Sequence, residues 1–403
     1  MLTFFQILIL GAGFGGMWAA LSVTRLLSLH DCHDVDVRVL APQPELRIRP
    51  RFYEPNAHQL FAPIAELFNA VGVDFISGTA ERIDVEHKTV AYSDTLGAIK
   101  TLVYDKLVLA TGSHLARPDT PGVAQHAFDV DQIEQAMRLE QHLERLIDLP
   151  ESKARNTVVV AGGGFTGIET ATEMPARLRA VLGENAEVDV IIVDRGLKVG
   201  ASLGDEISQS IAQACEALGV KWRLQTTVVA VDEHGVTLSD GQRIEANTVI
   251  WTTGVQANSL TAQIPGERDS LGRLHVDANL QVVGQPDIFA TGDVAYAATD
   301  DLGNHALMTC QHAIVLGRHA GHNVAAQLLG EEPIRYRQPK YVTCLDLGGW
   351  GAVYTEGWDR QVVLTGQEAK ALKTQINTVW IYPPAASREA AWAAADPMIP
   401  IVA

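Results

Sequence analysis

Residues 7–16 read ILILGAGFGG, and residues 158–167 read VVVAGGGFTG. Each run begins with apolar residues, enough for a buried parallel strand, and continues into a G-x-G-x-x-G pattern followed by a helical pattern. The spaced glycines are Gly11, Gly13 and Gly16 in the first run, and Gly162, Gly164 and Gly167 in the second. One such motif is weak evidence. Two in the same strand–turn–helix setting predict two dinucleotide-binding units.

The glycines of this pattern have separate physical tasks. The first permits a tight turn from strand to helix, the second lets the backbone approach a pyrophosphate, and the third lets the helix pack closely on the strand. The diphosphate then lies on the amide groups at the helix N-terminus, where the helix dipole favours negative charge. Two dinucleotides in one chain are most simply a flavin and a nicotinamide that exchange a hydride.

The composition is that of a soluble globular protein. The chain has 403 residues, of which 47% are hydrophobic and 20% charged, so a large core and two or three domains are expected. The formal net charge of −17 argues against nucleic acid, whose phosphates need a basic face, and against simple adhesion to anionic lipid. No apolar run reaches the ~18–20 residues of a membrane helix.

The cysteines and the N-terminus bear on the cellular compartment. Cys32, Cys215, Cys310 and Cys344 are scattered and form no C-x-x-C or metal-ligand spacing. This pattern predicts a reducing, cytoplasmic setting and no metal site. The first residues lead straight into the first expected strand, without the basic region of a signal peptide.

The first motif opens a block in which helices and strands alternate. We expect a helix over residues 14–29, a strand over 35–40, a helix over 59–71, a strand pair within 73–93, and a buried strand with a tight turn over 107–112. The second motif opens a similar block. Thr111-Gly112 and Thr253-Gly254 close equivalent strands in the two blocks, so the chain carries a coarse internal duplication.

This duplication predicts an α/β fold in which one Rossmann-like domain is inserted in another. A further apolar strand over 287–293 and a helix over 309–329 come after the second block, and we expect them to complete the first domain. The predicted boundaries are 1–125 and 270–330 for the first domain, 126–269 for the second, and 331–403 for a small C-terminal α+β region.

Four segments outside the glycine motifs resemble one family of flavoproteins. They read WTTGV at 251–255, TGD at 291–293 and GGWGAV at 348–353, and the fourth spans residues 357–384. The whole chain resembles the two-dinucleotide-binding flavoproteins of the pyridine nucleotide-disulfide oxidoreductase superfamily. Within them, these segments look most like type II NADH dehydrogenases. The resemblance implies FAD on the first Rossmann domain, NADH on the second, and reduction of a quinone.

On the FAD side, the resemblance assigns the first glycine motif and two later turns to the cofactor. The pyrophosphate would be cradled by Gly11, Gly13 and Gly16, with Phe14 and Gly15 in the same loop. The adjacent turn would be lined by Thr111 and Gly112. Asp293, which follows Gly292, would accept a hydrogen bond from the ribityl chain. An acid after a glycine at a strand end suits a polyol hydroxyl. The alternative for Asp293 is an ordinary helix N-cap.

On the NADH side, Gly162, Gly164 and Gly167 would hold the diphosphate, and Gly254 belongs to the neighbouring strand-end turn. Asp194 ends the second strand of this unit, where an acid hydrogen-bonds the adenosine ribose. Because a carboxylate there repels a 2′-phosphate, we expect NADH to be preferred over NADPH, although Arg195 beside it weakens that preference. Glu169 matches a glutamate that the family places near the nicotinamide–flavin stack. The alternative is a carboxylate that favours the helix dipole.

Two positions depart from the family pattern. Ala41 stands where the ribose-binding acid of the first domain is expected, so Glu45 or another group substitutes, or FAD binding tolerates the loss. The family's quinone-side helix begins with A-Q-x-A-x-Q, whereas residues 310–315 read CQHAIV. Gln311 matches, and its amide would face the flavin pyrimidine and stabilise the reduced anion. Val315 replaces the second Gln, which leaves the acceptor open.

Three further features have two interpretations each. Cys310 and Cys344 could meet beside the flavin, although small buried hydrophobes are the commoner case. His312 would relay a proton or be structurally satisfied. The segment 49–54 holds two guanidinium groups, a phenol and a carboxylate. It would contact the FAD diphosphate or the acceptor, or pack as an Arg–Glu pair.

The combined expectation is an FAD-dependent NADH dehydrogenase with Glu169 and Gln311 as catalytic residues and a quinone-like acceptor. Two other classes stay open: a reductase of a soluble protein carrier or small organic acceptor, and a non-catalytic module that senses flavin or nucleotide. Residues 390–403 contain no Lys or Arg, so we expect at most peripheral contact with the inner face of the membrane. A homodimer is a further expectation.

Overall fold

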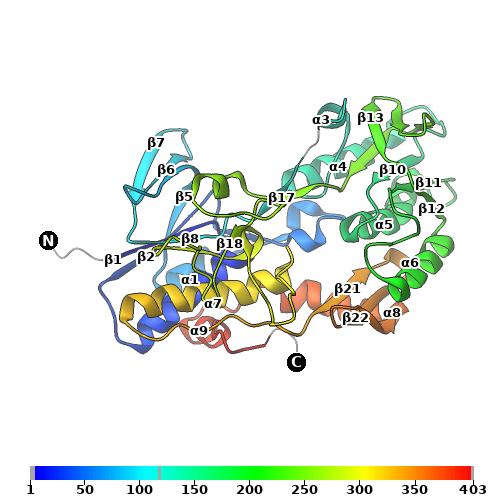
Figure 1. The fold of residues 1–403 in the computed structure, drawn as a ribbon. Coiled ribbons are helices and arrows are strands. Elements are labelled where there is room, and N and C mark those ends of the chain that lie inside the picture. The colour runs from blue at the N-terminus through cyan, green and yellow to red at the C-terminus, as the bar shows by residue number, and fades with distance from the viewer. Residues whose placement is uncertain (1–4, 117–118, 401–403) are drawn as a thin grey trace.

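The first glycine motif follows an inner strand of a seven-stranded sheet. The computed structural model describes residues 5–116 and 119–400. In spatial order the strands of this sheet are β19 (Ile288–Ala290), β8 (Lys106–Leu109), β1 (Phe5–Leu10), β2 (Val35–Ala41), β5 (Asp74–Asp84), β6 (Thr89–Asp94) and β7 (Ile99–Val103). The first five strands pair in parallel, and β6 and β7 extend the sheet in antiparallel fashion (Figure 1).

Helices α1 (Phe14–Leu29) and α7 (Cys310–Leu329) pack side by side against this sheet (Figure 1). A Cβ atom at Gly317 would lie 2.5 Å from the carbonyl oxygen of Gly15, and one at Gly321 would lie 2.1 Å from that of Ala19. Only glycine allows so close an approach of the two backbones. The packing therefore holds α7 against the loop of the first glycine motif.

The second glycine motif belongs to a four-stranded parallel sheet. In spatial order its strands are β12 (Val220–Arg223), β11 (Asp189–Val193), β10 (Thr157–Ala161) and β16 (Thr248–Trp251). Helix α5 (Phe165–Leu182) connects β10 to β11, and α6 (Asp205–Leu218) connects β11 to β12. Every residue of β10 is buried, as expected for a parallel strand that is covered on both faces.

Shorter elements lie around the two sheets. They are β3 (Glu45–Arg47) paired with β4 (Phe61–Pro63), β9 (Ser113–Leu115) paired with β17 (Val255–Ala257), β18 (Leu274–His275) paired with β20 (Ala295–Tyr296), the antiparallel sheet of β13 (Val228–Asp232), β14 (Gly235–Leu238) and β15 (Arg243–Glu245), and helices α2 (Ala65–Val71), α3 (Val123–His126) and α4 (Ile133–Arg145). The β9–β17 pair joins the loop after β8 to the loop after β16, and so ties the two units together.

The C-terminal residues add a third part. It contains an antiparallel sheet of β21 (Val342–Asp346), β22 (Ala352–Glu356) and β23 (Gln361–Thr365), then α8 (Gly366–Gln375), a π-helical turn η7 (Ile376–Trp380) and α9 (Arg388–Ala394). The sheet packs against α5 and α6, whereas α9 returns to α1 and α2 (Figure 1). Among the described residues, no helix has the length and apolarity needed to cross a membrane.

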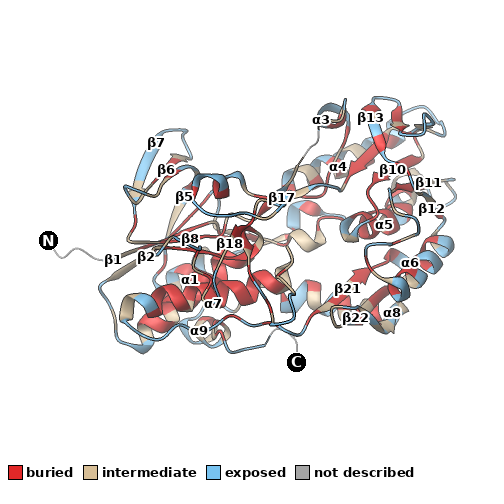
Figure 2. Ribbon diagram, viewed as in Figure 1, coloured by how far each residue is buried: buried red, intermediate tan, exposed pale blue. Residues whose placement is uncertain are grey.

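Burial follows the two sheets. Figure 2 shows that their strands and the helix faces turned toward them are buried. Ile7 and Ile9 lie in the core of the first unit, and Val158 and Ile192 lie in the core of the second. Burying an aliphatic side chain of this size contributes roughly 1.5–3 kcal/mol relative to leaving it exposed. The apolar runs before the glycine motifs thus anchor both phosphate-binding turns in rigid sheets.

The order of the strands agrees with the predicted insertion. β19 follows the second unit in the sequence but pairs with β8 of the first. The domain limits proposed above remain predictions. The helix predicted over 59–71 is wrong in its first half, because only Ala65–Val71 is α-helical. Pro63 explains the difference, since it lacks an N–H group and disfavours a helical conformation in the residue before it.

Candidate active site

A cavity of about 1340 Å³ lies where the three parts of the chain meet. The predicted site residues that line it are Gly11, Gly13, Phe14, Gly15, Thr111, Gly112, Glu169, Gly292, Asp293 and Gln311. Those that do not line it are Gly16, Gly162, Gly164, Gly167, Asp194 and Gly254. The cavity therefore connects the first phosphate-binding loop with Glu169 and the start of α7, and it reaches the second phosphate-binding loop at Phe165 and Thr166 but not at its glycines.

The loop after β1 has the geometry of a phosphate cradle. Gly11 has a φ of +104°, and a Cβ atom there would lie 2.4 Å from the carbonyl oxygen of Ala110. A Cβ atom at Gly16 would lie 1.9 Å from the carbonyl oxygen of Gly11. At Gly13 a Cβ atom would meet nothing within 4 Å. The outer two glycines are therefore needed for the turn, and the middle one leaves open space in front of the N-terminus of α1.

The polar groups beside this loop fit a flavin dinucleotide. The hydroxyl oxygens of Thr111 and Thr291 are buried and have no partner among the described residues. Asp293 Oδ2 accepts hydrogen bonds from Ser113 Oγ at 2.6 Å and Arg49 Nη1 at 3.3 Å. In the part of the chain that the structure describes, this side chain caps no helix. Unpaired buried hydroxyls are costly unless a ligand satisfies them. A ribityl chain and a pyrophosphate supply the matching donors and acceptors.

Arg49 links Asp293 to the second unit. Its Nη1 donates to Ser113 Oγ at 2.7 Å, and its guanidinium forms an ion pair with Asp131. Asp131 in turn accepts the backbone N–H of Leu115 at 2.9 Å. Each of the two interpretations of the segment 49–54 thus holds for part of it. Arg49 lines the cavity, whereas Arg51 and Glu54 form an ion pair of 2.7 Å.

The loop after β10 forms a second cradle of the same design. Gly162 has a φ of +117°, and a Cβ atom at Gly167 would lie 2.0 Å from the carbonyl oxygen of Gly162. A Cβ atom at Gly164 would meet nothing within 4 Å. Asp194 Oδ2 accepts the N–H of Gly163 at 2.8 Å, and its Oδ1 accepts that of Gly196 at 2.7 Å. Asp194 therefore shapes this loop, a task that the sequence did not suggest.

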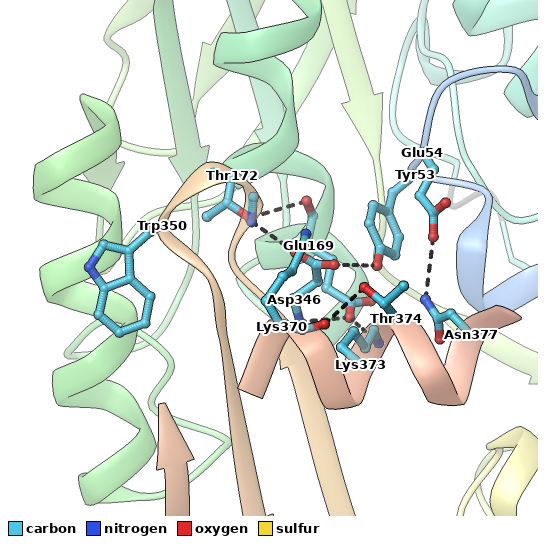
Figure 3. Close-up of polar contacts among 12 residues, drawn as sticks. Tyr53, Glu54, Glu169, Thr172, Asp346, Trp350, Lys370, Lys373, Thr374 and Asn377 are labelled. Carbon is cyan, nitrogen blue, oxygen red and sulfur yellow. Dashed lines mark hydrogen bonds and ion pairs between the residues drawn. The ribbon is translucent and has the colours of Figure 1, made fainter. Parts of the chain in front are cut away.

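Glu169 lies at the centre of a buried polar network (Figure 3). It is only 5% exposed, although it lines the cavity from the second turn of α5. Its Oε1 accepts hydrogen bonds from Lys373 Nζ at 2.8 Å and from the backbone N–H of Asp346 at 3.0 Å. Burial raises the pKa of Glu169 to about 7, against the opposing effect of the Lys373 charge. Interaction with the helix dipole alone does not explain so enclosed a carboxyl.

Asp346 extends this network toward α8 and the loop that holds Tyr53. Its Oδ1 accepts a hydrogen bond from Lys370 Nζ at 2.6 Å, and its Oδ2 accepts one from the Tyr53 hydroxyl at 3.1 Å (Figure 3). Burial raises the pKa of Tyr53 well above its usual value, and the Glu169 and Asp346 carboxyl groups raise it further. Sequence reasoning missed Lys373, Lys370 and Asp346. No local motif marks them, because they meet Glu169 only in the folded chain.

The remaining residues with two interpretations favour structural roles. Burial raises the pKa of Cys310 and of Cys344 to about 11, so both thiols stay neutral although both line the cavity. Burial lowers the pKa of His312 to about 4, and its Nδ1 accepts the N–H of Leu307 at 3.3 Å. The Gln311 amide exchanges two hydrogen bonds with the Val342 backbone. Gln311 therefore joins α7 to β21 at the cavity wall, and its catalytic role beside the flavin stays a prediction.

The model of the pyridine nucleotide-disulphide oxidoreductase family matches residues 5–317. The chain belongs to this family. An NADH dehydrogenase-like protein of Mycobacterium tuberculosis is 43% identical over 399 residues, which cover 98% of each chain. A type II NADH:quinone oxidoreductase of Staphylococcus haemolyticus is 27% identical over 393 residues, which cover 93% of this chain and 94% of that protein.

Solved structures agree on the fold. NDH2 from Plasmodium falciparum in complex with NADH has a TM-score of 0.76 at 16% identity, over 96% of this chain and 97% of that one. The sulfide:quinone oxidoreductase of Aquifex aeolicus has a TM-score of 0.74 at 18% identity, over 94% and 90%. The predicted fold class and family are thus confirmed. The protein is an FAD-dependent NADH dehydrogenase of this family. The roles of individual site residues stay predictions.

Proposed function

We propose that this protein transfers electrons from NADH through FAD to a quinone. The observation that carries the proposal is Glu169, a buried carboxyl with a pKa of about 7 that lines the cavity beside the first cradle. A group that titrates near neutral pH is suited to general acid catalysis. FAD, when bound, would supply the hydride and electron transfer chemistry between NADH and the acceptor. The protein itself then has to bind and align the cofactor and the two substrates, and to supply a proton.

The proton balance gives Glu169 a definite task. Reduction of a quinone to a quinol takes two electrons and two protons, whereas NADH releases one hydride, so each turnover takes up one further proton. Glu169 Oε1 already accepts two N–H groups. A proton on Glu169 therefore resides on Oε2, which has no partner among the described residues. We infer that Oε2 delivers this proton to the acceptor in the cavity.

The other assignments follow from the two cradles. We infer that Gly11, Gly13 and Asp293 hold FAD, with the open space at Gly13 for the pyrophosphate and the Asp293 carboxylate for a ribityl hydroxyl. NADH lies on the second cradle, where Asp194 disfavours a 2′-phosphate. The single negative charge of Asp194 supports a preference for NADH over NADPH.

An apolar acceptor suits the part of the cavity wall that the C-terminal residues form. Ile376, Trp380, Ile381 and Pro400 line the cavity there. Trp380 is also 57% exposed. Met398, two residues before Pro400, is 69% exposed. We propose that the quinone enters along these residues and that this side makes the peripheral membrane contact. The names of the staphylococcal relatives, which are quinone oxidoreductases, support the same acceptor class.

Stopped-flow kinetics test the proposal. NADH should reduce the flavin, and a short-chain quinone should reoxidise it faster than oxygen, a disulfide or a ferredoxin does. Glu169→Gln should slow reoxidation by quinone about 10²-fold, since a lost general acid costs this much, and should leave reduction by NADH within a few-fold of the original. In the unmodified enzyme the reoxidation rate should fall as the pH rises through about 7.

Three results would contradict this function. Fastest reoxidation by a protein carrier would make the chain a carrier reductase. A stable reduced flavin that no acceptor reoxidises would make it a sensor. Equal loss of both half-reactions in Glu169→Gln would remove Glu169 from proton delivery. Glu216→Gln is the matched control, because Glu216 is an exposed glutamate on α6 that does not line the cavity.

A further inference from the structure

A second ion pair, between Asp346 and Lys370, lies next to Glu169. Asp346 donates its backbone N–H to Glu169 Oε1 at 3.0 Å, and its own carboxylate is paired with Lys370 at 2.6 Å (Figure 3). The Asp346 side chain is 6% exposed and that of Lys370 is 31% exposed. Asp346 thus contacts Glu169 with its backbone N–H and contacts the partly exposed Lys370 with its carboxylate.

The charged and titratable groups around Glu169 come from several elements. They are Lys373 and Lys370 on α8, Asp346 and Cys344 on β21, Tyr53 in the loop after η1 (Arg49–Arg51), Cys310 on α7, and Glu173 on α5 itself, with Glu54 beside Tyr53. The cysteines and Tyr53 stay neutral. Lys373 and Asp346 are the charges that act most strongly on Glu169, and Asp346 is itself paired with Lys370.

We propose that Asp346 and Lys370 are positioning residues that set the pH range over which Glu169 holds its proton. The inference rests on the proposed function for its catalytic consequence. Asp346 fixes Glu169 Oε1 through its backbone and disfavours the ionised form through its carboxylate. Lys370 moderates this second effect because its ammonium group neutralises the Asp346 carboxylate from the solvent side.

The geometry requires opposite effects from the two partners. A nearby negative charge disfavours a second carboxylate, and a nearby positive charge favours it. Asp346→Asn removes the negative charge, so the pKa of Glu169 should fall. Lys370→Gln leaves the Asp346 carboxylate with its hydrogen bonds from Tyr53 and Gly348 but without a positively charged partner, so the pKa of Glu169 should rise. A purely structural role for this pair predicts no such reversal of sign.

The pH dependence of quinone reoxidation tests the inference in the holoenzyme. With menadione as the acceptor, the midpoint of the reoxidation rate should shift about one pH unit lower in Asp346→Asn and about half a unit higher in Lys370→Gln. Reduction of the flavin by NADH should keep its rate in both variants. Lys100→Gln is the matched control, since Lys100 pairs with Asp94 at 2.8 Å on β7 and β6, at the far end of the molecule from α8 (Figure 1).

An infrared titration gives a second readout that needs no acceptor. The band of a protonated carboxylic acid that disappears in Glu169→Gln belongs to Glu169, and its midpoint should move in the same two directions. Tyr53→Phe removes the hydroxyl donor to Asp346 without changing a charge, so its shift should be the smallest of the three. If Asp346→Asn does not fold, the upward shift in Lys370→Gln still decides the matter.

The outcomes separate this inference from the proposed function. Unchanged infrared midpoints, or shifts of one sign in both variants, would overturn the role of the Asp346–Lys370 pair while leaving quinone reduction intact. Opposite infrared shifts in a protein that quinones fail to reoxidise would overturn the quinone function and leave the pair in its role.

Discussion

The two Rossmann units share one glycine motif but present it to different surroundings. In the first unit Gly11 and Gly13 face the large cavity, and the second strand ends in Ala41. In the second unit Gly164 lies outside that cavity, and the second strand leads to Asp194, whose carboxylate holds two backbone N–H groups. A cofactor that stays bound suits the first arrangement. A substrate that enters and leaves at every turnover suits the second.

The largest effect, on flavin content and on reduction by NADH, should come from replacing the third glycine of each motif with alanine. Gly16→Ala would place a Cβ atom 1.9 Å from the carbonyl oxygen of Gly11, and Gly167→Ala would place one 2.0 Å from that of Gly162. Both helices must therefore shift. Gly16→Ala should yield protein without flavin, whereas Gly167→Ala should stay yellow and no longer be reduced by NADH. Flavin absorbance per chain and stopped-flow reduction measure the two effects.

A glycine with space around it controls for the change itself. A Cβ atom at Gly349 would come no closer than 3.9 Å to Leu218 Cδ2, so Gly349→Ala should keep both flavin and NADH reduction. Retention of FAD by Gly16→Ala would break the comparison, because the tight helix–strand contact would then be unnecessary for the first cradle.

These glycines were predictable because their constraint is local. Turn, strand and helix lie within ten residues, and the same holds for Asp293 after its strand. Lys373 and Asp346 are different, since they lie 204 and 177 residues from Glu169 in the sequence. Only the packing of β21 on α5 and of α8 on β21 brings them together. Their pairing depends on tertiary structure, which single-sequence patterns do not encode.

Asp194 shows a second limit. Its place at a strand end predicted ribose recognition, but the structure adds bonds to Gly163 and Gly196 that shape the loop. The pattern of strand and acid indicates where a carboxylate lies, and does not indicate which backbone groups turn toward it. Pro63 is a different case, because its effect on the predicted helix is visible in the sequence and the apolar periodicity around it points the other way.

A medium effect is expected at Asp194. Asp194→Ala should raise the Michaelis constant for NADH about 10-fold, since hydrogen bonds to a charged group are worth ~1.5–3 kcal/mol. It should also relax the discrimination against NADPH. Asp194→Asn helps to separate the causes, because it keeps one of the two acceptor oxygens that bind the loop and removes the charge that repels a 2′-phosphate. Steady-state kinetics with both nucleotides measure the ratio.

An unchanged ratio between NADH and NADPH in both variants would remove Asp194 from nucleotide selection and leave it only its loop contacts. Asp205→Ala is the control, since Asp205 is an acid in the first turn of α6 that pairs with Lys198 on the surface. Its loss should leave both Michaelis constants within about two-fold, the range expected for an exposed pair.

The smallest effect should come from making the first unit resemble the second. Ala41 ends β2, is 5% exposed and lines the cavity, and Glu45 lines the same cavity. If Glu45 replaces the missing acid, Glu45→Gln should weaken FAD binding about five-fold, as for one hydrogen bond of ~1 kcal/mol. Ala41→Asp should restore the affinity in that background. It should also lower the Tm of the flavin-free protein, because a buried carboxylate without a partner is costly.

Unchanged flavin affinity in Glu45→Gln and in Ala41→Asp would mean that the first cradle holds its cofactor without any ribose acid. The enclosing cavity would then account for the difference between the two units.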